Sequence, residues 1–183
     1  MPNQMEVSQI IQKKFLDDDP SALELVYEHF GKRLYGYLVS ILRSRSDAEE
    51  VLNELFMKVA VKREQVGKSD NLRVYLFAIA RNMAYEMCRK RSSQKETLSV
   101  YAEYLELCDD AAGRWNEEEL VAARKAVDSL PEEQREVVVL KIFEEMTFDE
   151  IAELLRISQN TAASRYRYAI EKMKDQMKGF GYE

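Results

Sequence analysis

Apolar residues return every three or four positions along most of the chain. After Pro20, such a series runs through Leu23, Val26, Tyr27, Phe30, Leu34, Leu38, Ile41 and Leu42. This spacing places the apolar side chains on one face of an α-helix. The strict alternation of apolar and polar residues that marks a β-strand is nearly absent from the sequence. The pattern therefore predicts an all-α protein.

Capping residues predict where the next two helices begin. Ser46-Asp-Ala-Glu49 has the form of a capping box, and it predicts a second helix that buries Val51, Leu52, Leu55, Phe56 and Val59. The polar stretch KREQVGKSDN then predicts a loop. Either Asp70 or Asn71 is expected to cap a third helix, which runs through LRVYLFAIARNMAYEMCRKR and ends in a basic cluster.

The helical spacing is lost between residues 92 and 117, which begin with a serine pair. Residues 92–130 carry nine acidic and four basic side chains, so this part of the chain is strongly acidic. Such a change of composition is typical of a linker between domains. We therefore predict two small helical domains, at residues 1–91 and 118–183, joined by an acidic linker at residues 92–117.

The second predicted domain contains the spacing of a helix-turn-helix. Pro131 is expected near the first turn of one helix, and the capping box Thr147-Phe-Asp-Glu150 begins the next, which extends to about Arg156. A three-residue turn follows, and Ser158 caps a longer helix from about Gln159 onward. In units of this kind the second helix enters the major groove of duplex DNA.

The longer helix is basic within an acidic protein. The whole chain has a formal net charge of −6, but Ser158 to Lys178 contains five basic and two acidic side chains. Arginine on such a helix can form forked hydrogen bonds to guanine or to phosphate. The alternative is an ordinary amphipathic helix with solvated charges and an inner face of Ala162, Tyr166, Ala169, Ile170 and Met173. The two interpretations are compatible, and they leave Tyr168 unassigned.

Other kinds of chemistry have little support in the sequence. Cys88 and Cys108 form no CxxC pair, the single histidine, His29, has no recognisable nucleophile beside it, and there is no glycine-rich phosphate loop. We therefore predict no metal, no cofactor and no catalytic activity. No apolar run approaches the ~18 residues that span a bilayer, and the N-terminus lacks the residue order of a signal peptide. The expected location is the cytoplasm.

Four motifs occur in an order that one protein family shares: DAEEVLNELF, YLFAIARN, LPEEQREV and T-x-x-E-I-A-E-L-L-x-I-S. Through them the chain resembles bacterial sigma factors of the extracytoplasmic-function (ECF) class, with region 2 at residues 20–91 and region 4 at residues 118–176. The resemblance implies a dissociable subunit of RNA polymerase that recognises promoters, melts DNA and starts transcription without catalysis of its own. It also implies three partners: core RNA polymerase, through its β′ clamp helices and β subunit, promoter DNA, and an anti-sigma factor.

The resemblance assigns candidate binding residues to three places. The residues expected to bind polymerase share one helix face, although a solvated polar face would have the same spacing; they are Glu50, Asn53 and Glu54. The residues expected at the melted −10 element are Arg63, Lys68, Asn71, Arg73, Tyr75, Arg81, Asn82 and Arg89. Those expected at the −35 element are Ser158, Gln159, Asn160, Thr161, Ser164, Arg165 and Arg167.

Five positions depart from the pattern of many relatives. Ala60 and Tyr75 stand where the family often carries tryptophan. Ala163 and Tyr168 stand where many relatives carry lysine and arginine, whereas Arg167 is basic where they often are not. These differences raise the alternative that the −35 contacts have moved along the helix.

Two other functions stay open from the residues alone. In a stand-alone helix-turn-helix regulator, residues 20–91 would serve dimerisation or sensing, but the acidic composition speaks against autonomous DNA binding, which relies on phosphate contacts. An all-helical interaction module would leave the basic helix and the YLFAIARN stretch unexplained. We therefore expect the free chain to bind promoter duplex weakly and the polymerase-bound chain to bind it specifically.

Overall fold

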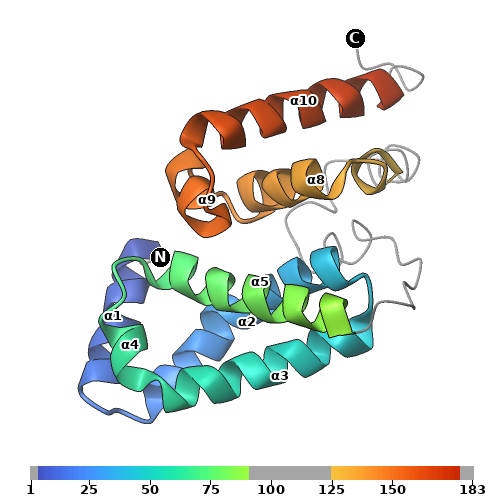
Figure 1. Cartoon of the computed structure of the whole chain (residues 1–183). Helices are drawn as coiled ribbons and strands as arrows, with labels where there is room; N and C mark the ends of the chain where they lie inside the picture. The colour runs from blue at the N-terminus through green and yellow to red at the C-terminus, as the bar shows by residue number, and fades with distance from the viewer. Residues whose placement is uncertain (1–3, 91–124, 178–183) are drawn as a thin grey trace.

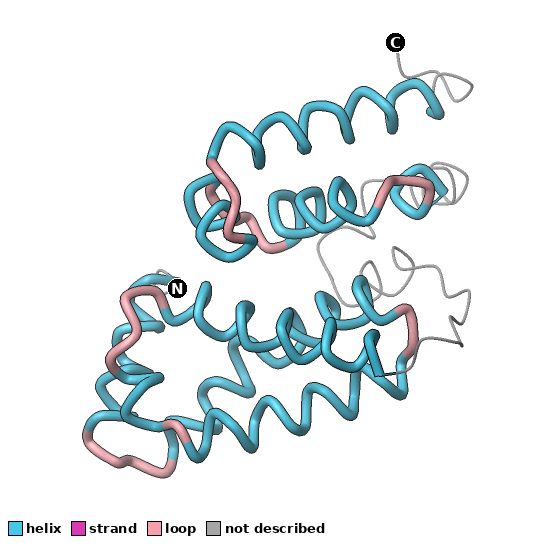
Figure 2. The backbone as a smooth tube through the Cα atoms, viewed as in Figure 1, coloured by secondary structure: helices cyan, strands magenta, loops and turns pink. Residues whose placement is uncertain are grey.

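The computed structural model describes residues 4–90 and 125–177, and within these ranges every regular element is a helix. Figure 1 shows the helices in two units, and Figure 2 shows the short loops that connect them within each unit. The predicted all-α class is confirmed. The predicted acidic linker at residues 92–117, with both of its boundaries, lies outside the described residues. None of the described helices has the length and apolarity needed to cross a membrane.

The first unit contains five helices: α1 (Gln4–Leu16), α2 (Ser21–Leu42), α3 (Arg45–Val61), α4 (Arg63–Gly67) and α5 (Leu72–Lys90). The long helix α2 packs against α1, α3 and α5. Each helix has one apolar face to bury, and the faces meet in a common core. The largest fully buried side chains of this unit are Ile11, Phe30, Leu34, Tyr37, Leu38, Leu55, Leu72, Leu76 and Phe77.

Three features of the first unit differ from the prediction. Helix α1 has no counterpart in it, and α4 lies within the stretch predicted as a loop. Helix α3 is capped by Ser44 rather than Ser46, because the Ser44 hydroxyl accepts a hydrogen bond from the Asp47 amide at 3.3 Å. Arg43, which ends α2 in the left-handed conformation with a φ of 53°, leads directly into this cap. The two helices therefore join by a tighter turn than the predicted capping box implies.

Contacts from α1 hold the loop between α4 and α5. The Gln12 amide nitrogen donates hydrogen bonds to the Ser69 carbonyl and, at 3.1 Å, to the Ser69 hydroxyl. Helices α1 and α4 approach each other closely at Gly67, where a Cβ atom would lie only 2.8 Å from the side chain of Leu16. Asn71, one of the two predicted caps, accepts a hydrogen bond at 3.2 Å from the amide three residues further on. The loop and the first turn of α5 are thus fixed to the rest of the unit.

The second unit contains α8 (Glu132–Val138), α9 (Phe148–Leu155) and α10 (Gln159–Met177). A π-helical turn, η1 (Val139–Phe143), continues α8. Figure 1 shows α8 and α10 running side by side, with α9 across their ends. This arrangement contains the predicted helix-turn-helix, formed by α9 and α10.

Both predicted caps of the helix-turn-helix are confirmed. Thr147 and Glu150 form the capping box at the start of α9. The Ser158 hydroxyl accepts a hydrogen bond from the Thr161 amide at 3.0 Å and so begins α10. Between the helices, Arg156 adopts the left-handed conformation with a φ of 56°. The turn is short because one residue reverses the chain.

The two units pack against each other through α5 with α9 and through α2 with α8 and η1. Buried apolar side chains of both units belong to one continuous cluster. The second unit contributes Val137, Val139, Leu140, Met146, Ile151, Leu154, Leu155 and Ala162 to it. The arrangement of the units is therefore supported by apolar burial as well as by the polar contacts of α5.

Candidate nucleic-acid interface

A pocket of about 380 Å³ lies where the loop before α5 and the first turns of α5 face α9. From the second unit it is lined by Glu153, Leu154 and Arg156. Five of the eight residues predicted at the −10 element line it from the first unit: Lys68, Asn71, Tyr75, Arg81 and Asn82. The structure therefore brings five of the eight residues that the resemblance assigned to the −10 element to one pocket.

Arg73 lies close by and is held by the second unit. Its Nη2 atom donates to both carboxylate oxygens of Glu150 at 2.7 Å, and its Nη1 atom donates to the Glu144 carbonyl at 3.1 Å. The Asn71 amide also donates to Glu150, at 3.0 Å. Burial alone would raise the pKa of Glu150, but hydrogen bonds from Arg73, the Thr147 amide and Asn71 lower it to about 2. The carboxylate is therefore ionised at neutral pH and pairs with Arg73 as a charged group.

Arg81 is held in the same way by Glu136 of α8. Its Nε atom donates to Glu136 Oε1 at 2.8 Å, and its Nη2 atom to Oε2 at 3.3 Å. Tyr37 and Tyr85 donate their hydroxyls to the same carboxylate, at 2.8 Å and 3.4 Å. Burial and the nearby charge of Glu136 raise the pKa of both tyrosines, so that both stay protonated as donors. Glu136 is only 6% exposed, and these four hydrogen bonds replace the water that its carboxylate loses on burial.

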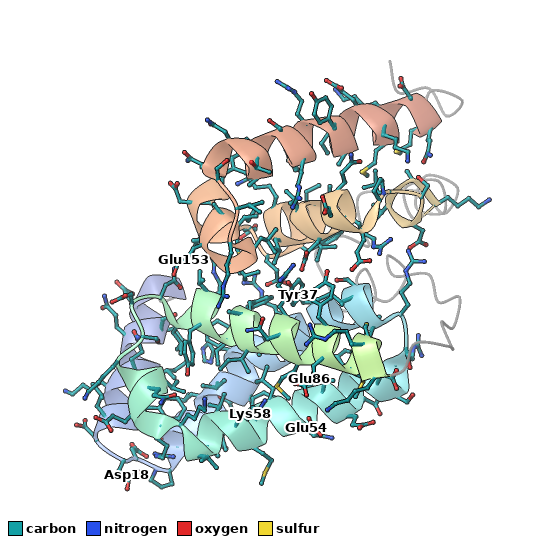
Figure 3. All side chains as sticks on the ribbon, viewed as in Figure 1. Asp18, Tyr37, Glu54, Lys58, Glu86 and Glu153 are labelled. Atoms are coloured by element: carbon teal, nitrogen blue, oxygen red, sulfur yellow. The ribbon has the colours of Figure 1, made fainter. Side chains whose placement is uncertain are left out.

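Two of the side chains labelled in Figure 3, Tyr37 and Glu153, lie near the boundary between the units. Tyr37 and Glu153 both appear where α5 and α2 approach the second unit. In that region the guanidinium of Arg81 also lies over the ring of Tyr85, 4.6 Å from the ring centre. The sequence did not single out Tyr37, Tyr85 or Glu136. The spacing offers no signal for them, because Tyr37 and Glu136 lie 99 positions apart.

Two of the predicted −10 residues, Arg63 and Arg89, lie away from the pocket. Arg63 is tied to the loop between α1 and α2: its Nε atom lies 2.6 Å from Asp18, and its Nη2 atom donates to the Asp19 carbonyl at 2.7 Å. Lys68 lines the pocket and pairs with Glu64 one turn earlier. Arg89 is exposed near the end of α5. The structure does not bring Arg63 and Arg89 to the pocket.

The residues predicted to bind polymerase form an exposed face of α3: Glu50, Asn53 and Glu54. Glu50 and Glu54 border a hollow of about 230 Å³ between α3 and α5, where Lys58, Glu86 and Lys90 add further charges. Figure 3 labels Glu54, Lys58 and Glu86 along this side of the molecule. Lys58, Glu86 and Lys90 were not predicted, although acidic and basic residues four positions apart on a helix are a recognisable signal.

The residues predicted at the −35 element lie on α10 and at the turn before it. Three of them are fully exposed: Ser158, Gln159 and Asn160. Thr161 and Ser164 are partly buried, and the Thr161 hydroxyl lies 2.8 Å from that of Ser158. The start of α10 therefore presents a polar surface, on which the hydroxyls of Ser158 and Thr161 are hydrogen-bonded to each other.

The two arginines of α10 have different environments. Arg165 is partly buried, and its Nη2 atom lies 2.5 Å from a carboxylate oxygen of Glu133, just inside α8. Arg167 is exposed, and its guanidinium lies 5.2 Å from the centre of the Tyr168 ring. Tyr168 itself is 52% exposed, so it belongs to the outer face rather than to the core. Neither Glu133 nor Tyr168 was among the predicted residues.

Two family models match the chain, one for each unit. The model described as "Sigma-70 region 2" matches residues 26–94, and the model described as "Sigma-70, region 4" matches residues 120–173. The matches follow the chain order that the four sequence motifs predict. Together they cover most of the chain.

Curated relatives match over nearly their whole length. The chain is 25% identical over 158 residues to "RNA polymerase sigma factor SigZ" of Bacillus subtilis strain 168, a match covering 86% of this chain and 88% of the relative. It is 26% identical over 160 residues to "ECF RNA polymerase sigma factor RpoE" of Cereibacter sphaeroides, covering 87% and 88%.

Two solved structures have a similar fold. CnrH, in complex with the cytosolic domain of CnrY, gives a TM-score of 0.69 at 19% identity over 94% of this chain and 98% of that chain. The sigma factor RpoE of Bartonella quintana, in complex with the anti-sigma factor NepR, gives 0.60 at 22% identity over 80% and 90%. At these identities the likeness is one of fold.

Proposed function

Because the chain belongs to the sigma-70 family and to its ECF class, we infer that it acts as a sigma factor: it binds core RNA polymerase and directs promoter recognition, DNA melting and transcription initiation. The observation that carries this function is the match of regions 2 and 4, in that order, to two helical units. Sigma factors are non-catalytic initiation factors, so the bond-forming chemistry belongs to the polymerase. We place this work in the cytoplasm, where bacterial RNA polymerase meets DNA.

Reconstituted transcription tests this function. Purified full-length protein is added to core RNA polymerase with a library of promoter fragments, and transcript starts are mapped with and without the protein. We expect defined starts that require the protein. A stand-alone regulator, which the two-region match does not favour, would instead bind duplex tightly without the core enzyme and give no new starts.

We propose that the pocket beside α5 receives a base flipped out of the melted −10 strand. Its volume of about 380 Å³ is within the range of small-ligand pockets, roughly 300–1,000 Å³. Tyr75 supplies an aromatic ring, and the side chains of Asn82 and Arg81 supply hydrogen-bond donors. Stacking of a base on an aromatic side chain contributes about 1–3 kcal/mol. Arg73 is proposed to contact the backbone of the same strand.

We propose that Arg167 is the arginine of α10 that meets the −35 duplex. A helix turns by about 100° per residue, so Arg167 lies about 140–160° around the axis from the buried Ala162 and Ala169 and points outward. Arg165 lies within about 60° of both alanines, on the flank that meets Glu133. Arg165 is therefore proposed to hold α10 against α8, while Tyr168 supports the guanidinium of Arg167.

The exposed face of α3 is the proposed contact for the β′ clamp helices. Glu50, Asn53 and Glu54 present two carboxylates and an amide on one face, which suits a basic or polar partner. Complementary charge of this kind speeds association and fixes register. An anti-sigma factor is a further proposed partner, since the fold relative RpoE of Bartonella quintana forms a complex with the anti-sigma factor NepR.

A further inference from the structure

The loop between α4 and α5 supplies one wall of the proposed base pocket and is anchored to α1. All four of its residues line the pocket: Lys68, Ser69, Asp70 and Asn71. Gln12 Nε2 donates one hydrogen bond to the Ser69 carbonyl and another, at 3.1 Å, to the Ser69 hydroxyl. The same hydroxyl donates to the Val66 carbonyl at 2.8 Å. Ser69 is therefore fixed by α1 on one side and by α4 on the other.

Helix α4, which leads into this loop, is itself held at both ends. At its start, Arg63 Nε lies 2.6 Å from Asp18, and Arg63 Nη2 donates to the Asp19 carbonyl at 2.7 Å. At its end, Gly67 lies directly against the side chain of Leu16. The loop therefore takes its position from α1 and from the turn that follows α1.

Asp70 lies between two fixed residues, and its own carboxylate is left for a ligand. Asn71 rather than Asp70 caps α5, because Asn71 Oδ1 accepts the Val74 amide at 3.2 Å. The Asn71 carbonyl also accepts the Tyr75 amide, at 2.9 Å. Within the described part of the chain, no hydrogen bond or ion pair engages the Asp70 carboxylate, which is exposed at the pocket wall. The loop thus holds one accepting group in a fixed place.

An ionised carboxylate accepts hydrogen bonds and donates none, so it distinguishes bases by the donors that they carry. Adenine, cytosine and guanine each have an exocyclic amino group that donates, and we call them amino bases. Thymine has carbonyl oxygens in the corresponding places, and a carboxylate repels them. A base that is flipped out of the stack presents this edge to its pocket. An acidic side chain in the wall of a base pocket therefore favours an amino base over thymine.

We propose that Asp70 selects the flipped base, favouring an amino base over thymine, and that Gln12 is a positioning residue that holds Asp70 in place through Ser69. The inference rests on the proposed function, which supplies the strand that carries the base. Gln12, Ser69 and Asp70 all belong to the first unit, so the inference does not depend on how the two units pack.

Strand binding by the holoenzyme tests both residues. Full-length protein is combined with core RNA polymerase, and fluorescence anisotropy follows the binding of labelled single strands that carry the −10 region of a promoter mapped by reconstituted transcription. An abasic site is placed at each position in turn. The flipped position is the one at which the abasic site weakens binding by the wild type but not by Asn82→Ala, which has already lost a polar group of the pocket.

Cytosine and thymine, which are similar in size, are then compared at that position. We expect the wild type to bind the cytosine strand about tenfold more tightly, the scale of one hydrogen bond to a charged group. Asp70→Asn should remove the preference, because an amide turns either its oxygen or its nitrogen toward the base and so pairs with both. Glu28→Gln makes the same change of charge at an exposed position of α2 outside the pocket, and it should keep the preference.

Gln12→Ala and Gln12→Glu should each lose most of the preference, since neither new side chain donates to Ser69. Their binding of the abasic strand should match the wild type. A general loss of structure would weaken binding of all strands together, so the ratio of the cytosine and thymine affinities separates positioning from stability. Gln9→Glu, at an exposed position of α1, is the control and should behave as the wild type. Thermal melting monitored by circular dichroism verifies that each variant is folded.

The assignment of Asp70 is overturned if folded Asp70→Asn keeps the preference, or if Glu28→Gln loses it equally, since that would make net charge the cause. An unchanged ratio in both Gln12 variants would overturn the positioning role. If the protein directs promoter-specific starts but its holoenzyme binds thymine as tightly as cytosine, the proposed function stands and this inference fails. If the protein gives no starts with core polymerase and no position of the strand responds to an abasic site, the proposed function fails and the inference fails with it.

Discussion

The faces of α5 and α3 carry the two proposed binding surfaces of the first unit, and they differ in access. On α5, Arg73 and Arg81 are covered by carboxylates of the second unit. On α3, Glu50 and Glu54 stand exposed on the side that borders α5 and not the second unit. The difference teaches that the α3 face is accessible in the arrangement in which the cationic groups of α5 are already paired within the chain.

Charge reversal on the exposed face should have the largest effect. We expect Glu54→Lys to weaken binding to core polymerase on the order of a hundredfold, because opposite charges at an interface are replaced by like charges. The melting temperature and the small-angle X-ray scattering of the free chain should stay unchanged, since Glu54 is exposed. Biolayer interferometry against core enzyme measures the affinity. Glu49→Lys, the same change at an exposed position five residues earlier on α3, is the control. A large loss of melting temperature without loss of binding would make this face structural.

The arginines of α10 extend the comparison to the second unit. Arg167→Ala should lower initiation from a cognate promoter by about 5- to 150-fold, the equivalent of about 1–3 kcal/mol for a lost specific contact. Its melting temperature should match the wild type, because the side chain is exposed. Arg165→Ala should instead lower the melting temperature, since it frees Glu133 and loosens α10 from α8.

Run-off transcription and differential scanning calorimetry on both α10 variants decide between these roles. The opposite outcome, with transcription lost only in Arg165→Ala, would restore the assignment in which Arg165 meets the −35 element. Loss of transcription in both variants with unchanged stability would mean that both arginines contact DNA.

Acidification should weaken the contact of Glu150 with Arg73, so that the face of α5 becomes as accessible as the face of α3. The pKa of Glu150, paired with Arg73 across the two units, is about 2, below its ordinary value of 4.5. Its stabilisation of the contact between the units is therefore complete above about pH 4.5 and is lost progressively as the pH falls toward 2. Small-angle X-ray scattering of the wild type between about pH 5 and pH 3 should show expansion. The Glu150→Gln variant should change less over this window, and an equal change in both would assign the effect to other carboxylates.

Loss of one hydroxyl should give the smallest effect. Tyr37→Phe removes one of the four hydrogen bonds to Glu136 and leaves the Arg81 pair in place. A hydrogen bond to a charged group contributes about 1.5–3 kcal/mol. The contact between the units through Glu136 should therefore be weakened measurably but not abolished. Thermal melting monitored by circular dichroism should place this variant between the wild type and Glu136→Gln. Tyr27→Phe, at an exposed position of the same helix, serves as the control. Identical results for Tyr37→Phe and the wild type would show that the Tyr37 hydroxyl does not stabilise the contact between the units.

Local patterns predicted most of the second unit. The capping box at Thr147 and Glu150 and the cap at Ser158 are contacts between residues three apart, so the sequence alone specifies them. The same logic misplaced one cap, since Ser44 and Ser46 both fit the local signal and the end of α2 decides between them. Helix α1 escaped prediction because its burial depends in part on partners in α4 and α5, which are distant in sequence.

The sequence by itself determined the all-α class, the helix-turn-helix, the family motifs and the types of residue at each proposed binding surface. Only the tertiary structure decided how those residues are engaged. Arg73 and Glu150 lie 77 positions apart, and Arg81 and Glu136 lie 55 apart, so no periodicity links them. The two pairs form because apolar packing of the units carries α8 and α9 onto α5, and charges that are distant along the chain become neighbours only when that packing is in place.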